Sequence, residues 1–472
     1  MQTTAEPSKT VPLGPSLTEE QARQIFHQGE EAVVFALLKL AKQAEPSNAI
    51  TSPSTPSGMV APFHKPNTHS SSKKPGRRAG HTGSRRSAPD RVDQKQTHRA
   101  KCCPNCGGAL NRCNQTRQRY TEDIPKDTAP VVTEHTIHRD WCPHCNKHVE
   151  PIVPDALPKA TLGNRILILS AWLHYGLGNT LSQIVEIFNH HLQIKLTPGG
   201  LIQMWYRLQA ILFAWYLEIQ AEALKSAVLH ADETGWRVDG KTHWLWCFST
   251  LDVTFYMIDR SRGSPALMKF FQEEFNGTLI SDFWGAYNAV VCRRRQTCLV
   301  HLLRDLEYVE TYRRVDKNWA EFAKKLRRLV YDAIRLWKRE NVSSKEFASR
   351  RARLDIRLGE LIEREWKHME AKRLVKRLRR HRNDMFTFLD EAGVPFENNH
   401  AERAIRPAVL IRKNSYNNRS QRGADTQAVL MSVYRTLKQR GHHPINTIVK
   451  AIESYLTTGK LPQLPAPAAA DG

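Results

Sequence analysis

The spacing of apolar residues changes at Val228, and this change constrains the fold more than any other feature of the sequence. Upstream, over residues 162–224, apolar side chains recur every three to four positions, which predicts helices. Downstream, short runs of β-branched and aromatic residues predict strands, and Asp239-Gly240 between the first two runs is a hairpin signal. We therefore expect an antiparallel meander of three strands. The runs are Val228–Asp232, which leads into Glu233–Trp236, then Thr242–Ser249 and Val253–Ile258.

After the meander, helical and extended patterns alternate. We expect a helix over Ala266–Phe275, a fourth strand over Thr278–Asp282 and a fifth over Thr297–His301. Consecutive strands followed by alternating helix and strand form the ribonuclease-H-like topology. We therefore expect an α/β domain of this topology in a chain that is α+β and multidomain as a whole, and a large helical insertion that interrupts this domain.

Composition divides the 472 residues into eight segments. The N-terminal helix, Leu17–Ala44, can pair with a partner helix or pack on its own core. The helices before the sheet are compatible with helix-turn-helix DNA binding and equally with a plain connector. The expected segments are an N-terminal helix (1–45), a flexible basic linker (46–100), a zinc ribbon (101–155), a helical domain (156–225), the first part of the ribonuclease-H-like core (226–301), a basic helical insertion (302–394), the final core helices (395–440) and a C-terminal helix and tail (441–472).

Four cysteines form two Cys-x-x-Cys knuckles, which are Cys103 with Cys106 and Cys142 with Cys145. Each knuckle places two thiolates on one tight turn, and two knuckles complete a tetrahedral zinc site. Gly107 permits the turn after the first knuckle, and Val131–Ile137 between the knuckles is expected to be a strand. We expect a zinc ribbon with one structural Zn²⁺. Four reduced cysteines that bind no metal are the alternative, and Cys102 is a spare thiol that can replace Cys103.

The net charge of +23 points to a polyanionic partner, most simply DNA. Arg293–Arg382 holds 28 Lys and Arg against 13 Asp and Glu, which accounts for most of the excess. Between His64 and Lys101 there are eleven basic residues and two Asp, which favours a phosphate-tracking arm over a solvated tail. The candidate DNA contacts in this linker are Arg77, Arg78, Arg85 and Arg86.

The sequence gives no indication of export or of a membrane. Its first residues are polar and Pro-rich, and no apolar run reaches the roughly 18 residues of a membrane span. Nine cysteines in a chain of this length do not form a disulfide scaffold. We expect a cytoplasmic, nucleoid-associated prokaryotic protein.

Three acidic residues occupy distinctive positions in the expected fold. Asp232 ends the first strand, Asp282 ends the fourth, and Glu402 lies on a helix that begins near Asn398 or Asn399. In a ribonuclease-H-like sheet the first and fourth strands are neighbours and a later helix packs across them, so the three carboxylates can converge. Such oxygen ligands suit Mg²⁺ or Mn²⁺, and two ions about 4 Å apart can promote phosphodiester cleavage. An apolar stripe would fix the helix against the core: Ala401, Ala404, Ile405 and Ala408.

The sequence resembles DDE transposases of the insertion-sequence-66 type over roughly residues 65–460. The motifs that carry the resemblance are the two cysteine knuckles, His230–Thr234, Ser281–Tyr287, Cys298–His301 and Asn398–Pro407. The resemblance implies that Asp232, Asp282 and Glu402 are catalytic ligands of two Mg²⁺ or Mn²⁺ ions. It also implies cleavage at transposon terminal inverted repeats and strand transfer into target DNA. The expected assembly is a homodimer or larger, with accessory proteins of the same element. Glu397 stands where the family usually has Asp.

Neighbouring residues are candidates for DNA binding. His301 is expected either to contact a phosphate or the metal site or to be a structural histidine. Arg403 and Arg406 can hold the scissile phosphate or pair with the acids, and Arg412 with Lys413 is expected in a basic loop after the helix. A DNA-binding protein without catalysis is an alternative function, and a nuclease that cuts without joining is another.

Overall fold

The computed structural model describes residues 19–27, 29, 33–34, 89–111, 116–125 and 128–469. The first helix, α1, spans Glu19–His27, and the rest of the expected N-terminal helix lies outside those residues. The linker candidates Arg77, Arg78, Arg85 and Arg86 lie outside them as well. In the part of the chain that is described, no helix has the length and apolar character needed to cross a bilayer.

The helices expected before the sheet are present, with one correction. The first apolar run of this region, Ile166–Leu177, predicts one helix, but the structure has α3 (Asn164–Ala171) followed by a π-helical turn, η3 (Trp172–Gly176). Next come α4 (Leu181–His191), which Thr180 begins with a capping box, and α5 (Pro198–Leu224), which Thr197 caps. The buried face of α5, including Trp205 and Trp215, belongs to the same apolar core as the sheet.

Five strands form a mixed sheet in the order β5-β4-β3-β6-β7. β3 pairs antiparallel with β4, and β4 with β5, which confirms the expected meander. β6 runs parallel to β3, and β7 runs parallel to β6. This order confirms the α/β fold class and is compatible with a ribonuclease-H-like domain. The strands are β3 (Val228–Val238), β4 (Lys241–Ser249), β5 (Thr254–Asp259), β6 (Phe275–Ser281) and β7 (Cys292–Thr297).

Three expected boundaries in and next to the sheet are wrong. The helix expected over Ala266–Phe275 is α6 (Ser264–Phe270), and Phe275 instead begins β6. Asp232 does not end a strand, because β3 continues to Val238 and pairs with β4 beyond that position. The fifth strand is β7, five residues earlier than expected, and His301 lies on the following helix. β7 is an edge strand, where exposed charges such as those of Arg293 and Arg294 are tolerated and weaken the apolar alternation that predicts strands.

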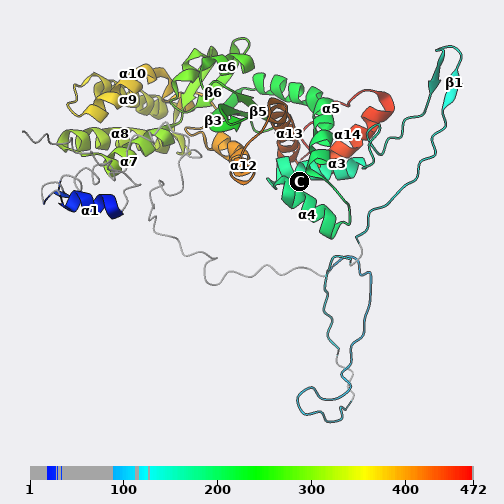
Figure 1. The fold of residues 1–472 in the computed structure, drawn as a ribbon. Helices are drawn as coiled ribbons and strands as arrows, with labels where there is room; N and C mark the ends of the chain where they lie inside the picture. Colours follow the sequence, from blue (N-terminus) through cyan, green and yellow to red (C-terminus); the bar gives the residue numbers. More distant parts are fainter. Residues whose placement is uncertain are drawn as a thin grey trace, which may run out of the picture.

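The expected insertion is helical and lies on one side of the sheet, whereas α5, α13 and α14 lie on the other (Figure 1). A second apolar core, which includes Leu306, Phe322 and Leu374, holds the insertion together. A buried ion pair between Asp305 and Arg377 joins its first and fourth helices. The helices are α7 (Leu299–Tyr312), α8 (Lys317–Trp337), α9 (Ser344–Glu363), α10 (Met369–Arg380) and the short α11 (Thr387–Asp390).

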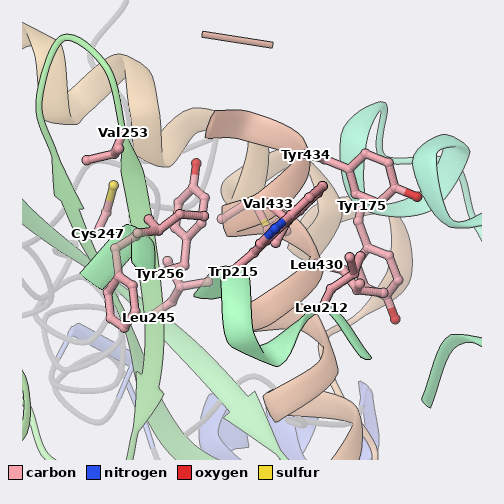
Figure 2. Packing of buried hydrophobic residues seen from close by; sticks show 14 of the residues in the cluster. Tyr175, Leu212, Trp215, Leu245, Cys247, Val253, Tyr256, Leu430, Val433 and Tyr434 are labelled. Carbon is pink, nitrogen blue, oxygen red and sulfur yellow. The ribbon is translucent and has the colours of Figure 1, made fainter. Parts of the chain in front are cut away.

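Three helices complete the chain: α12 (Asn399–Ser415), α13 (Gln421–Gln439) and α14 (Pro444–Thr458). α13 lies between β5 and α5, and its Leu430, Val433 and Tyr434 pack among residues of both (Figure 2). On its sheet side, Ser432 Oγ accepts the backbone N–H of Tyr256 at 2.9 Å, and Thr436 Oγ1 accepts that of Thr254 at 3.1 Å. These two hydroxyls, one helical turn apart, satisfy outward N–H groups of the edge strand β5.

The Asp305–Arg377 pair generates a stability prediction. Burial raises the pKa of Asp305 although Arg377 opposes the shift, so the intact pair contributes little net stability. Asp305→Ala leaves the Arg377 guanidinium, 17% exposed, without a carboxylate. We expect the free energy of unfolding to fall by about 3–5 kcal/mol, measured by denaturant melting. Arg335→Ala, which breaks a pair on the surface of α8, should cost no more than about 1 kcal/mol; equal losses in the two variants would refute this account.

Candidate active site

Asp232 and Asp282 are brought together by the parallel pairing of β3 with β6. The register aligns Val228 with Thr278 and His230 with Ile280. Continued by two residues, it sets Asp232 beside Asp282, which directly follows the last residue of β6. Neighbouring strands lie about 4.8 Å apart. The two carboxylates therefore stand next to one another where the parallel pairing ends.

The helix that carries Glu402 is fixed to the sheet through its first residues. Asn398 donates from Nδ2 to the carbonyl oxygen of Ala231 at 2.8 Å, and its Oδ1 lies 3.0 Å from His230 Nδ1. His400 Nε2 lies 2.9 Å from Ser249 Oγ on β4. Asn398 occupies the N-cap position, as expected, but its side chain makes no capping hydrogen bond because the strand uses it. The expected apolar stripe of Ala401, Ala404, Ile405 and Ala408 is buried.

Glu402 is directed to the first helix of the insertion. Arg304 Nη1 and Nη2 donate to the two carboxylate oxygens of Glu402 at 3.0 and 3.4 Å, and His301 Nε2 lies 3.7 Å from Oε1. α7 is held in place because the N–H of Leu299 donates to the carbonyl oxygen of Phe396, two residues before Asn398. The expected pairing of Glu402 with Arg403 or Arg406 is therefore wrong, and Arg304 is its partner.

Asp232 and His301 are close enough to the neighbouring acids for those charges to shift their pKa values. Burial raises the pKa of Asp232 well above its usual value, and the charges of Glu233, Asp282 and Glu402 raise it further. Burial lowers the pKa of His301, but Cys298, Asp282 and Asp232 outweigh burial and bring it to about 9. The site is thus a group of carboxylates that repel one another, and the positive charge of the nearby His301 opposes this repulsion.

Glu233, next to Asp232 in β3, belongs to a different network that the sequence did not reveal. Adjacent strand residues point to opposite faces, and Glu233 is buried where Arg262 donates to Oε1 at 3.0 Å and Tyr287 Oη to Oε2 at 2.7 Å. The Arg262 guanidinium lies between the rings of Trp244 and Trp284, 4.5 and 3.9 Å from their centroids. The backbone N–H of Trp284 donates to Asp282 Oδ1 at 2.8 Å. This network fixes the loop that positions Asp282.

The four basic candidates that follow Glu402 separate into two groups. Arg403 and Arg406 are exposed on α12, and Lys413 is exposed near its end. Arg412 instead reaches β3, where it donates to Thr234 Oγ1 at 3.0 Å and to the carbonyl oxygen of Gly235. The expectation of a loop at Arg412 and Lys413 is wrong, because α12 continues to Ser415.

Each cysteine knuckle has its own turn. The N–H of Gly107 donates to the carbonyl oxygen of Cys103 at 2.8 Å, and φ of Gly107 is +73°, as its sequence position requires. The second knuckle closes a hairpin of β1 (Asp140–Cys142) and β2 (Lys147–Val149). Hydrogen bonds from the backbone lower the thiol pKa of Cys103 and of Cys142. A lowered pKa favours the thiolate that binds metal.

The strand expected at Val131–Ile137 is wrong. The segment is exposed and extended, and β-branched residues form strands only against a neighbouring strand. The two knuckles lie in separate stretches of chain (Figure 1). Across the described ranges, no three or more His, Cys, Asp or Glu side chains are gathered closely enough to hold one metal ion.

The donor types nevertheless fit the expected metals. Four thiols in two knuckles match the ligand set of structural Zn²⁺. Carboxylate oxygens match Mg²⁺ or Mn²⁺, and a divalent cation would relieve the repulsion that raises the pKa of Asp232. For Glu402 to join Asp232 and Asp282 around one ion, its side chain must rotate away from Arg304.

Comparison with known proteins identifies the family. Residues 159–426, more than half of the chain, match the family described as Transposase IS66 family. The chain belongs to the IS66 transposase family. Residues 100–146 match the zinc-finger binding domain of transposase IS66, so this member also carries the zinc-finger domain of the family. A protein of Sinorhizobium fredii named "Uncharacterized protein y4qI" is 24% identical over 246 residues, which are 45% of this chain and 44% of that relative. That match spans less than half the length of the relative.

The role of Asn398 in this family member can be tested by Asn398→Ala. Burial lowers the pKa of His230 to about 4, so its imidazole is neutral, and the variant leaves both this ring and the Ala231 carbonyl without their partner. We expect the free energy of unfolding to fall by about 1–3 kcal/mol in denaturant melts. Asn399→Ala is the matched control, because the Asn399 side chain bonds only to Glu397. A control as damaging as the variant would contradict the assignment.

Proposed function

We propose that this protein is a DDE-type transposase that cleaves DNA at the ends of a transposon and transfers the strand into target DNA. The observation that carries the proposal is that Asp282, which follows β6, and Glu402 of α12 lie close enough to Asp232 of β3 for their charges to act on it. Family membership supports the transposase role. Divalent cations held by these carboxylates would activate the attacking water or 3′-hydroxyl and stabilise the leaving oxygen.

The side chains around the acids have distinct tasks in this proposal. Asp232 and Asp282, fixed by the sheet, provide a rigid pair of oxygen donors, and Glu402 is the adjustable third. His301 and Arg304 place N–H donors beside Glu402, where a phosphate of the bound strand would lie. Arg403 and Arg406, exposed on the same helix as Glu402, are proposed to contact the flanking backbone.

The proposed chemistry is tested with a substrate carrying the inverted repeats that flank the gene, with Mg²⁺ or Mn²⁺ present. Asp232→Asn, Asp282→Asn and Glu402→Gln should each lower the cleavage rate by about 10³-fold or more, because each removes several kcal/mol of transition-state stabilisation. Asp252→Asn, at an exposed turn between β4 and β5, should leave the rate unchanged. Cleavage that survives Asp232→Asn would overturn the proposal, and cleavage without joined products would indicate a nuclease.

We further propose that Cys103, Cys106, Cys142 and Cys145 bind one structural Zn²⁺. Metal analysis of reduced protein should find about one zinc ion per chain. Cys103→Ser should abolish or sharply reduce it, whereas Cys102→Ser, at the adjacent exposed thiol, should retain it. Full zinc content in Cys103→Ser with loss in Cys102→Ser would assign the neighbouring thiol as the ligand instead.

A further inference from the structure

Helix α10 presents a row of basic side chains that nothing described so far uses. Lys372, Lys376 and Arg380 are exposed and follow one another at four-residue intervals, so they lie along one side of the helix. Its opposite side is buried in the core of the insertion through Ala371, Leu374, Val375 and Leu378. Figure 1 shows α10 at the outer edge of the insertion. We name these three cations the α10 row.

The α10 row is one of the places in the insertion where exposed cations have no carboxylate close by. Several cations on and next to α8 and α9 instead have a carboxylate within ion-pair distance: Arg327 with Glu310, Arg328 and Arg335 with the Asp332 that they share, Arg350 with Glu346 and Arg364 with Glu321. Among the residues that the structure describes, no carboxylate lies within ion-pair distance of Lys372, Lys376 or Arg380. The row is thus a local excess of positive charge, with its three cations along one side of a single helix.

The other flank of α10 contacts the candidate active site. Arg377 pairs with Asp305, which adjoins Arg304 on α7, and its guanidinium lies 5.1 Å from the ring centroid of Phe283. His381, at the end of α10, lies edge-on to the same ring at 5.5 Å. Phe283 directly follows Asp282. Residues four apart on a helix are offset by about 40° around the helix axis. Along the row, each cation therefore lies closer to the side that carries Arg377, and Arg380 lies closest to it. The C-terminal end of the row therefore lies nearest to the acids.

We propose that the α10 row binds the phosphate backbone of a DNA strand that passes through the active site. This inference rests on the proposed function and extends it to a specific surface. The row spans about 12 Å of helix, which corresponds to three or four nucleotides at about 3.4 Å each along one strand. Its three charges carry no base-specific geometry, so it holds the strand in position without reading its sequence.

The test compares the salt dependence of DNA binding. The triple variant Lys372→Gln, Lys376→Gln, Arg380→Gln is titrated with a labelled DNA duplex of arbitrary sequence, without divalent cations. Removal of three phosphate contacts should reduce the slope of log K against log salt concentration by about 3. Binding at about 0.1 M salt should weaken at least about tenfold. The matched control, Arg328→Gln, Arg335→Gln, Arg350→Gln, removes as much charge from paired, exposed positions and should change the slope little.

Two further variants keep the result decisive. The charge-preserving set Lys372→Arg, Lys376→Arg, Arg380→Lys should restore the wild-type slope, and the three single Gln variants should each lower it by about 1 if the triple variant fails to fold. An unchanged slope in the triple variant overturns the proposal and would favour an acidic protein as the partner. An equal loss in the control also overturns it, because DNA binding would then depend on overall charge and not on the α10 row. Because binding is measured without cleavage, an inactive wild-type protein that binds with the expected slope would refute the proposed chemistry and leave the α10 row supported.

Discussion

Negative charge gathered where the parallel pairing of β3 with β6 ends is the constraint on which the rest of the structure depends. Burial and the charges of Glu233, Asp282 and Glu402 raise the pKa of Asp232, and burial with the charge of Asp282 raises the pKa of Glu233. Unpaired buried charges cost several kcal/mol each, so they persist only with compensation. Arg262 after β5 and Arg304 with His301 on α7 supply it. The first helix of the insertion is therefore part of the electrostatic frame of the sheet.

The pairing of Glu402 with Arg304 is suited to exchange. Arg304 is 51% exposed and Glu402 28% exposed, so the bidentate pair contributes only about 0–1 kcal/mol. It fixes the direction of the carboxylate without holding it strongly. Asp232, in contrast, is held by strand pairing on one side and by the packing of α12 on the other. The site thus combines rigid donors from the sheet with one donor whose partner can change.

The sequence predicted the parts of the fold that follow from local periodicity. The three-strand meander, the existence of a fourth strand and the apolar stripe of α12 were all visible in the spacing of apolar residues. β7 was misplaced because the exposed charges at Arg293 and Arg294 concealed its strand pattern. The end of α12 was placed too early because Pro407 and the polar run after it do not resemble a helix interior, yet the buried stripe carries the helix to Ser415.

The partners of the acids were beyond prediction from the sequence for a different reason. Arg304 precedes Glu402 by 98 residues and Asn398 follows His230 by 168, and local spacing carries no information about such pairs. Glu233 was visible as an acid, but only the burial of its face distinguishes it from a surface residue. The cysteine knuckles were recognisable because their chemistry is local to each turn, whereas the strand between them depends on a distant partner.

The contact of α13 with β5 has a consequence for how several copies of the chain can assemble. Ser432 and Thr436 accept hydrogen bonds from the outward N–H groups of Tyr256 and Thr254. At the opposite edge of the sheet, the Thr387 hydroxyl donates to the carbonyl oxygen of Arg295. Helices of the same chain thus bond to both edge strands, β5 and β7, so a strand of a neighbouring copy cannot pair with the sheet at these positions. If copies of the chain assemble, the sheet cannot be extended at these positions, and contacts between copies would use side chains on helices and loops.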